Sequence, residues 1–244
     1  MPWGGDSITG VFAAYNEEKS VEAAMARALD ALRDQFRQFE IVIVEDASRD
    51  RTPALCDALA SAHPEIRVLH NETNLGQGAS LVRGFRQARF DLVTHNAMDY
   101  PFDLRGLRLM TTLLAGADIA VAARRSRAGY SPYRVLTSAV HRALLHLLFP
   151  LRLRDHNFVQ IYPRAVWEAV NVEARSTAFL TPEAPIRAYD MGYRVCEVEI
   201  EYHPRTAGVA TSGKPKVILH SLRDMFAFWW KRVRRRTPRG KRPL

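Results

Sequence analysis

Carboxylates and other polar side chains follow two apolar, β-rich segments near the start of the chain. Tyr15-Asn16-Glu17 comes directly after the first segment, and Glu45-Asp46-Ala47-Ser48-Arg49-Asp50 ends the second, with three carboxylates within six residues. One of Ser48 and Asp50 is enough to cap a following helix. At least one carboxylate therefore remains for a ligand, and Asp46 is suited to accept hydrogen bonds from a base or a ribose.

Other segments have both a chemical and a structural interpretation. The turn at 71–79 contains two glycines and opens a helix, whose first N–H groups bind an anion or simply form a tight turn. Asn96-Ala97-Met98-Asp99 follows a further apolar run, and Asp103 on the next turn is either a cation ligand or a helix cap. Asn16 could likewise cap a helix, with Glu17 in its first turn.

The alternation of apolar runs and amphipathic stretches predicts the scaffold that positions these residues. Near-continuous apolar runs predict strands covered on both faces at residues 8–14, 40–45, 67–70, 92–96 and 119–122. Helical periodicity predicts helices at 18–35, 52–62 and 79–88. Parallel strands joined by helices place the polar segments at the carboxyl ends of the strands, where open α/β sheets bind ligands.

The pattern changes after about residue 125. We expect helices at 135–148 and 217–230 and strands at 158–162 and 194–202, built onto the same sheet without a separating linker. The sequence therefore predicts one domain over residues 1–216, followed by a C-terminal amphipathic helix and basic tail over residues 217–244.

The net charge belongs to that tail. The 244-residue chain has a formal net charge of +9, but its last 14 residues hold eight basic side chains and no acid, which leaves +1 for the rest. Such a tail attracts anionic lipid headgroups or nucleic acid, or is only a solubilising end. Trp229 and Trp230 precede it, as in an interfacial membrane helix, although packing on the domain would explain the same residues.

Composition narrows the class of protein further. A hydrophobic fraction of 47% supports a globular core and excludes low-complexity and disulfide-scaffold classes. Cys56 and Cys196 lie in apolar stretches, so we expect buried free thiols in a reducing compartment. No apolar run reaches the roughly 18 residues of a membrane span, and no secretory signal is visible, so we expect a cytoplasmic location.

Taken in order, these motifs resemble the family-two inverting glycosyltransferases. The similarity lies in the Tyr-Asn-Glu segment, the Asp-x-Ser-x-Asp-x-Thr segment, an Asn-x-Gly-x-Gly helix start and the acidic end of the fourth strand. Within that family the dolichol-phosphate mannosyltransferase-like branch is the most similar. This similarity rests on Gly192-Tyr193-Arg194-Val195, Glu197-Val198, Arg205-x-x-Gly208 and Ser212-x-Lys214, and the whole resemblance covers about residues 8–216.

The resemblance implies the GT-A fold, an α/β fold with a mostly parallel central sheet flanked by helices, and a hexosyltransferase that uses a nucleotide-diphosphate sugar with Mg²⁺ or Mn²⁺. It implies contacts to the nucleotide sugar from Ala14, Tyr15, Glu17, Asp46, Asn96, Ala97 and Arg124. Asp99 is implied as metal ligand and, with Arg205, as catalytic. Contacts to the acceptor or a phosphate are implied for Arg134, Ser212 and Lys214.

The chain departs from the family pattern at Ala97, which stands where the family has the first acid of its Asp-x-Asp motif. Asp99 is the second acid, and one carboxylate can suffice because Mg²⁺ takes its other ligands from phosphate and water. Asn96 has a carbonyl oxygen nearby but, on a strand, points to the opposite face from Ala97. The segment 155–160 also departs from the family's Ser-Gly-Phe type of loop, and in it His156 is either a catalytic base or a structural histidine.

These features predict a glycosyltransferase that moves a sugar from a nucleotide-diphosphate donor to a polyprenyl phosphate or other acceptor with inversion. The basic tail would hold it peripheral to the inner face of the cell membrane. An alternative, motivated by Ala97, is a degenerate family member that binds nucleotide or a partner without catalysis. A nucleic-acid binder has only the charge of the tail in its favour, and we expect no specific nucleic-acid partner.

Overall fold

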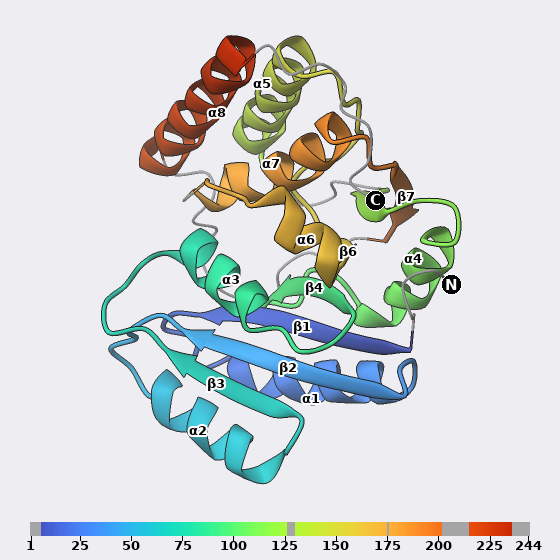
Figure 1. The fold of residues 1–244 in the computed structure, drawn as a ribbon. Helices are drawn as coiled ribbons and strands as arrows, with labels where there is room; N and C mark the ends of the chain where they lie inside the picture. Colours follow the sequence, from blue (N-terminus) through green and yellow to red (C-terminus); the bar gives the residue numbers. More distant parts are fainter. Residues whose placement is uncertain (1–5, 126–129, 175, 202–214, 236–244) are drawn as a thin grey trace.

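One sheet of seven strands forms the centre of the molecule (Figure 1), in the order β3-β2-β1-β4-β6-β5-β7. The computed structural model describes residues 6–125, 130–174, 176–201 and 215–235. The strands are β1 (Ser7–Ala14), β2 (Gln38–Glu45), β3 (Ile66–His70), β4 (Leu92–Ala97), β5 (Ile119–Arg124), β6 (Gln160–Pro163) and β7 (Val195–Ile200). Strand β6 runs antiparallel to β4 and β5, and the other pairings are parallel, which confirms the predicted mostly parallel sheet.

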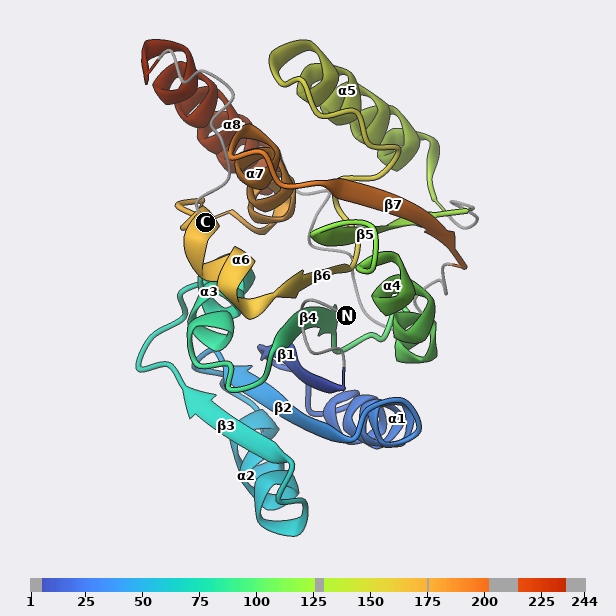
Figure 2. The ribbon, with the colours of Figure 1, turned by 45° about the vertical axis from the view of Figure 1, so that its right-hand side comes forward.

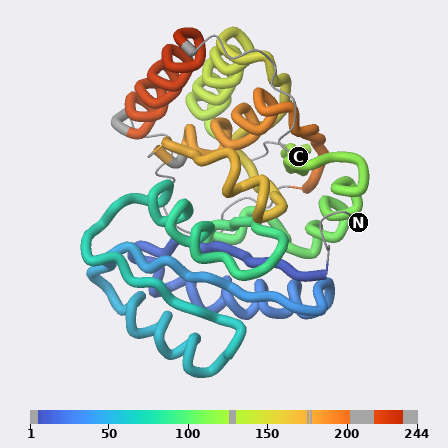
Figure 3. Tube along the Cα trace, viewed as in Figure 1, coloured from blue at the N-terminus to red at the C-terminus, as the bar shows by residue number. Residues whose placement is uncertain are grey.

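Helices cover both faces of this sheet (Figure 2). They are α1 (Val21–Arg33), α2 (Thr52–Ala62), α3 (Gln77–Arg86), η1 (Leu104–Gly106), α4 (Leu107–Leu113), α5 (Pro132–Leu148), α6 (Arg164–Val170), α7 (Thr177–Asp190) and α8 (Pro215–Arg235). Helices α1, α2 and α4 share one hydrophobic cluster with the sheet. Helices α3, α6 and α7 share a second, to which α5 contributes Leu145 and α8 contributes Met225. In the tube trace, the second half of the chain lies above the N-terminal strands β1, β2 and β3 (Figure 3).

The seven predicted strands all exist, although the two late ones are shorter than expected. The predicted helices also exist; α2 has the predicted bounds, and α1 begins at Val21 rather than at residue 18. Helices α4, α6 and α7 were not predicted. The first two have only seven residues each, and α7 contains Pro182 and Pro185, which normally argue against a helix.

Helix α7 tolerates Pro185 because the sheet supplies a hydrogen bond that the helix lacks. Pro185 has no N–H for the carbonyl of Thr181, four residues earlier. The side chain of Gln160, on β6, donates to that carbonyl at 2.8 Å. The bond ties α7 to the centre of the sheet.

Close packing holds α3 against β1 and β2. A Cβ atom added at Gly84 would lie 2.3 Å from Val11 Cγ1 and 3.0 Å from Val44 Cγ2, so the helix approaches the sheet at a distance that only glycine allows. Both cysteines are free, as predicted, with Cys56 buried and Cys196 half-buried.

Candidate functional site

The loops at the carboxyl edge of the sheet begin with strained backbone. Asn16 after β1, Ala47 after β2 and Tyr100 after β4 have φ angles of 55°, 56° and 49°. Non-glycine residues adopt this left-handed conformation at a cost of about 1–3 kcal/mol, and such residues are concentrated at functional sites. Three of them at one edge support the predicted position of the site.

The first two loops hold each other through reciprocal hydrogen bonds. Asn16 N donates to Ser48 Oγ at 3.0 Å, and Arg49 N donates to Asn16 Oδ1 at 2.9 Å. The alternative that Asn16 caps a helix is therefore wrong, because α1 begins five residues later, at Val21, and the Asn16 side chain accepts a hydrogen bond from the neighbouring loop.

Asp46 is 2% exposed and is the anchor of a third loop. Its Oδ1 accepts hydrogen bonds from Asn71 Nδ2 at 2.6 Å and Leu75 N at 2.9 Å, and its Oδ2 accepts one from Gly76 N at 2.8 Å. Gly76 has a φ angle of 85° and precedes the first residue of α3. This carboxylate therefore fixes the start of α3, and a contact with a base or ribose stays a prediction.

At the end of β4, the methyl group of Ala97 and the carboxylate of Asp99 lie two residues apart. Asn96, Ala97 and Asp99 all line one cavity. The Asn96 amide holds the following turn, since its Nδ2 donates to Phe102 O at 2.8 Å and its Oδ1 accepts from Ala97 N at 3.0 Å. Asp103 accepts from Arg105 N at 3.0 Å, which confirms its interpretation as a cap.

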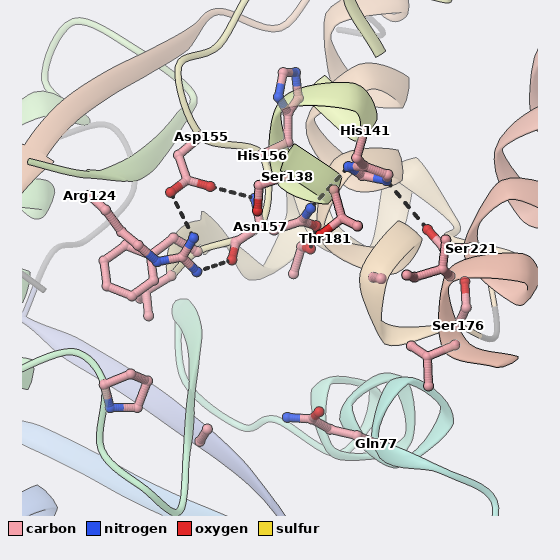
Figure 4. A pocket seen from close by; sticks show the side chains of 18 of the residues that line it. Gln77, Arg124, Ser138, His141, Asp155, His156, Asn157, Ser176, Thr181 and Ser221 are labelled. Atoms are coloured by element: carbon pink, nitrogen blue, oxygen red, sulfur yellow. Dashed lines mark hydrogen bonds and ion pairs between the residues drawn. The ribbon is translucent and has the colours of Figure 1, made fainter. Parts of the chain in front are cut away.

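This cavity has a volume of about 570 Å³ and lies between the sheet edge and the second half of the chain (Figure 4). Helix α5 contributes one side of its surface to the wall, through Arg134, Thr137, Ser138, His141, Arg142 and Leu145. Residues of α3, α7, α8 and the loop before β6 complete it. A cavity of this size is typical of small-molecule sites.

Arg124 at the end of β5 is held on three sides. Its Nη1 pairs with Asp155 Oδ2 at 2.9 Å, and its Nη2 donates to the carbonyl of Asn157 at 2.5 Å. Its guanidinium also lies over the Phe158 ring, with Cζ 4.4 Å from the centroid. Asp155 Oδ1 in turn accepts from Asn157 N at 3.1 Å, so the charge and the loop are fixed together.

A chain of hydrogen bonds links this loop to α7, α5 and α8 (Figure 4). Thr181 Oγ1 donates to Asn157 Oδ1 at 2.8 Å, and Asn157 Nδ2 lies 3.3 Å from His141 Nδ1. His141 Nε2 lies 3.4 Å from Ser221 Oγ. Burial lowers the pKa of His141 to about 4, so its ring is neutral at pH 7. Nδ1 then accepts from Asn157, and Nε2–H donates to Ser221.

Two arginines give the cavity its positive character. Arg134 lies over the Tyr130 ring, with Cζ 4.1 Å from the centroid, and Arg142 donates to the carbonyl of Arg154 at 3.5 Å. Among the residues that the structure describes, neither has an acidic partner. They therefore favour an anionic ligand.

His156 is 3% exposed at the cavity wall, with its ring 5.5 Å from that of His146. Burial, and after it the neighbouring His146 and His141, lowers the pKa of His156 to about 4. Such a group accepts a proton weakly at neutral pH, which favours its structural interpretation over a role as a base.

Five of the predicted site residues meet at this cavity: Asn96, Ala97, Asp99, Arg124 and Arg134. Four others lie outside its wall, at the strand ends and loops of the sheet edge: Ala14, Tyr15, Glu17 and Asp46. Arg205, Ser212 and Lys214 lie outside the described residues. The sequence interpretation missed Ser138, His141, Asn157, Thr181 and Ser221, of which the first two share the side of α5 that carries Arg134.

Comparison with known proteins identifies the family. Residues 11–158 match the family described as Glycosyl transferase family 2. Two curated relatives are similar: glycosyltransferase AglD of Haloferax volcanii, 28% identical over 238 residues, and the undecaprenyl-phosphate 4-deoxy-4-formamido-L-arabinose transferase of Pseudomonas paraeruginosa, 29% identical over 215 residues. These matches cover 93% and 85% of this chain but only 37% and 60% of the relatives.

Comparison with solved structures agrees with this family match. The glucosyl-3-phosphoglycerate synthase of Mycobacterium tuberculosis superposes with a TM-score of 0.70 at 16% identity, over 93% of this chain and 80% of that one. This likeness confirms the predicted GT-A architecture. Because the match to the family covers more than half of its length, the chain belongs to glycosyl transferase family 2.

Proposed function

We propose that this protein transfers a sugar from a nucleotide-diphosphate donor to a lipid phosphate, with inversion at the anomeric carbon. The observation that carries the proposal is the composition of the cavity. Asp99 lies at the end of β4, and Arg134 and Arg142 on α5 line the same cavity without an acidic partner among the described residues. A site that binds two phosphate-bearing substrates needs cations of this kind.

The relatives support both proposed substrate classes, the nucleotide-diphosphate sugar as donor and the lipid phosphate as acceptor. One is named as an undecaprenyl-phosphate sugar transferase, and the mycobacterial synthase was solved with Mn²⁺ and UDP-glucose. The loops around Asp46 and Asn16 occupy the edge of the sheet where open α/β proteins bind nucleotides. We therefore place the nucleoside near Ala14, Tyr15, Glu17 and Asp46, and the diphosphate near Asn96, Ala97 and Asp99.

A divalent metal fits this site only as an ion that arrives with the donor. Among the described residues no group of three His, Cys, Asp or Glu side chains is arranged to hold a metal, and the turn after β4 contributes a single acid, Asp99, to the cavity wall. Mg²⁺ is commonly bound through one or two carboxylates and substrate phosphates. Asp99 would hold the ion, and the ion would neutralise charge on the departing diphosphate.

The chemistry needs no strong protein base. A lipid phosphate is already an anion, so its oxygen can form the new bond to the anomeric carbon while the bond to the donor diphosphate breaks and the nucleoside diphosphate leaves with the electron pair. Arg134 and Arg142 would orient the acceptor phosphate, and Arg124 would stabilise charge on the leaving group. Neutral His141 and His156 fit a site without general-base catalysis.

The basic tail is the remaining part of the proposal. We assign residues 1–216 to the transferase domain and residues 217–244 to a helix and tail that hold the protein peripheral to the inner face of the membrane. Much of the tail, residues 236–244, lies outside the described part of the chain. Attraction of its Lys and Arg side chains to anionic lipid supports this assignment.

A thermal-shift panel of UDP-, GDP-, CDP- and dTDP-sugars, with and without Mn²⁺, tests the donor, because a ligand that binds only the folded state raises its Tm. We expect one nucleoside to raise the Tm, more strongly with Mn²⁺. A nucleotide shift without turnover on polyprenyl phosphate would favour the alternative suggested by Ala97, a nucleotide-binding relative without catalysis. The absence of any shift would contradict the proposed donor.

A further inference from the structure

Helix α5 is amphipathic in the opposite sense from an ordinary surface helix. Its polar residues Arg134, Ser138, His141 and Arg142 face the cavity. Its outward side presents apolar residues at a spacing of three and four: Tyr133, Leu136, Val140, Ala143 and Leu147. Leu136 is 62% exposed and Leu147 is 79% exposed. A helix at the surface of a water-soluble domain normally buries its apolar side and exposes its charged one.

Exposed apolar side chains are concentrated on two helices. Of the twelve large hydrophobic residues that are exposed in the described part of the chain, five lie on α5 and four on α8. Those on α8 are Leu219, Phe226, Trp230 and Val233. Figures 1 and 2 both place α5 and α8 together at the end of the molecule opposite α2 and β3. We call the outward sides of these two helices the apolar end face.

The charges that α5 and α8 bring to this face are mainly positive. Helix α5 contains no Asp or Glu, and the single acid of α8, Asp224, is half-buried and accepts hydrogen bonds from Ser176 N at 2.9 Å and Ser176 Oγ at 2.6 Å. Arg223, Lys231 and Arg234 are exposed on α8. Lys231 pairs with Glu173 at 2.7 Å, and Arg234 lies 4.6 Å from the Trp230 ring centroid. Aromatic and aliphatic side chains flanked by cations match an anionic lipid surface.

The size of the face argues against a second protein copy as the occupant. The stripe on α5, from Tyr133 to Leu147, and the one on α8, from Leu219 to Val233, each run about 21 Å at about 1.5 Å per residue. Two stripes about 10 Å wide offer on the order of 400 Å². A stable protein interface buries about 800 Å² on each partner. A lipid bilayer has no such minimum, because each apolar side chain that enters it contributes separately.

We propose that the apolar end face lies on the membrane surface, with the outward stripe of α5 inserted among the lipid acyl chains. None of the described helices is long and apolar enough to cross a membrane, so α5 and α8 would lie in the plane of the interface. The inference deepens the proposed function and rests on it in one respect. A lipid phosphate could reach Arg134 and Arg142 from the bilayer, because these residues occupy the inner side of the helix whose outer side contacts lipid.

Vesicle flotation at about 1 M NaCl isolates this contact, because the screening length falls to about 3 Å and the tail's electrostatic attraction is suppressed. The vesicles consist of phosphatidylcholine with phosphatidylglycerol. We compare the full chain with Leu136→Gln, with the triple variant Leu136→Gln/Val140→Gln/Leu147→Gln, and with Leu109→Gln as a matched control. Leu109 is 50% exposed on α4, outside the end face, and glutamine is a good helix former, so these variants should fold.

We expect vesicle affinity to fall about tenfold in Leu136→Gln and at least about fiftyfold in the triple variant, and to be unchanged in Leu109→Gln. Equal affinity in the wild type and the triple variant would overturn the inference. So would a wild-type dimer in sedimentation that the triple variant abolishes without a change in vesicle binding.

The same proteins are tested for a Tm increase with nucleoside diphosphates, which separates the two proposals. If the triple variant loses vesicle affinity but no nucleoside diphosphate raises the Tm, the proposed membrane surface is supported and the proposed nucleotide-sugar donor is contradicted. If a nucleoside diphosphate raises the Tm but the wild type and the triple variant bind vesicles equally, the proposed donor is supported and the proposed membrane surface is contradicted.

Discussion

The guanidinium of Arg124 and the carboxylate of Asp155 form an ion pair of 2.9 Å in which the side chains are 14% and 5% exposed. The pair joins the end of β5 to the loop that precedes β6 and places a compensated charge at the cavity wall. Arg124 is therefore already oriented before any ligand arrives, whereas Arg134 and Arg142 have no acidic partner among the described residues and carry the net positive charge of the cavity.

Replacing the acid of this pair tests its structural role. Asp155→Asn should lower the free energy of unfolding by roughly 3 kcal/mol, because it removes the carboxylate charge that compensates the largely buried Arg124 guanidinium. Urea denaturation measures the change. Glu199→Gln is the matched control, since Glu199 pairs with Arg154 at an exposed position and its loss should cost less than about 1 kcal/mol. Equal effects of the two variants would contradict the role of the buried pair.

Asp46→Asn should release the loop that starts α3. The variant removes the charge that supports three hydrogen bonds from Asn71, Leu75 and Gly76, at a cost of about 2 kcal/mol. Hydrogen exchange at the amides of Leu75 and Gly76 should accelerate. Glu72→Gln, an exposed change in the same loop, should leave both rates unchanged. Slow exchange in Asp46→Asn would show that something other than this carboxylate fixes the loop.

A second acid introduced into the cavity wall tests the single-carboxylate metal site directly. Ala97→Asp places a second acid two residues from Asp99, at a position that lines the same cavity. In the presence of the nucleoside diphosphate that binds, it should raise the affinity for Mn²⁺ at least about tenfold in titration calorimetry. Leu109→Asp, an added acid on α4, is the control for the change in charge. Unchanged Mn²⁺ affinity in Ala97→Asp would place the metal elsewhere.

Asp99→Asn should reduce sugar transfer by about two orders of magnitude or more with the fold intact. The carboxylate would be lost as a ligand while the shape of the side chain is kept. Steady-state transfer rates and the far-ultraviolet circular dichroism spectrum measure the two effects. An undiminished rate would remove Asp99 from the catalytic role.

The sequence predicted the sheet well because doubly covered strands are apolar runs, and runs such as 40–45 are hard to mistake. The family resemblance implied the residues at strand ends, Asn96 to Asp99 and Arg124, and the parallel topology places such strand ends at one edge of the sheet. The contribution of α5 could not be predicted in the same way. A helix with Arg134, His141 and Arg142 on one side is normally interpreted as exposing that side, and here that side lines the cavity.

The pH dependence of stability should include a contribution from His70. Burial lowers its pKa, but hydrogen bonds to Asp57 at 3.0 Å and Glu45 at 3.2 Å prevail and raise the pKa above 6.5. A raised pKa in the folded state means that this stabilisation is complete below pH 6.5 and is lost as pH rises through the folded-state value. His70→Gln should therefore narrow the Tm difference between pH 6 and pH 8.5. An unchanged difference would exclude this contribution.

The most direct test of the proposed function is a product assay with polyprenyl phosphate and the nucleotide sugar that raises the Tm. We expect a sugar phospholipid that partitions into organic solvent, with the anomeric configuration opposite to that of the donor, and a much lower yield with Arg134→Gln. Release of free sugar without a lipid product, or a product that retains the donor configuration, would contradict the account.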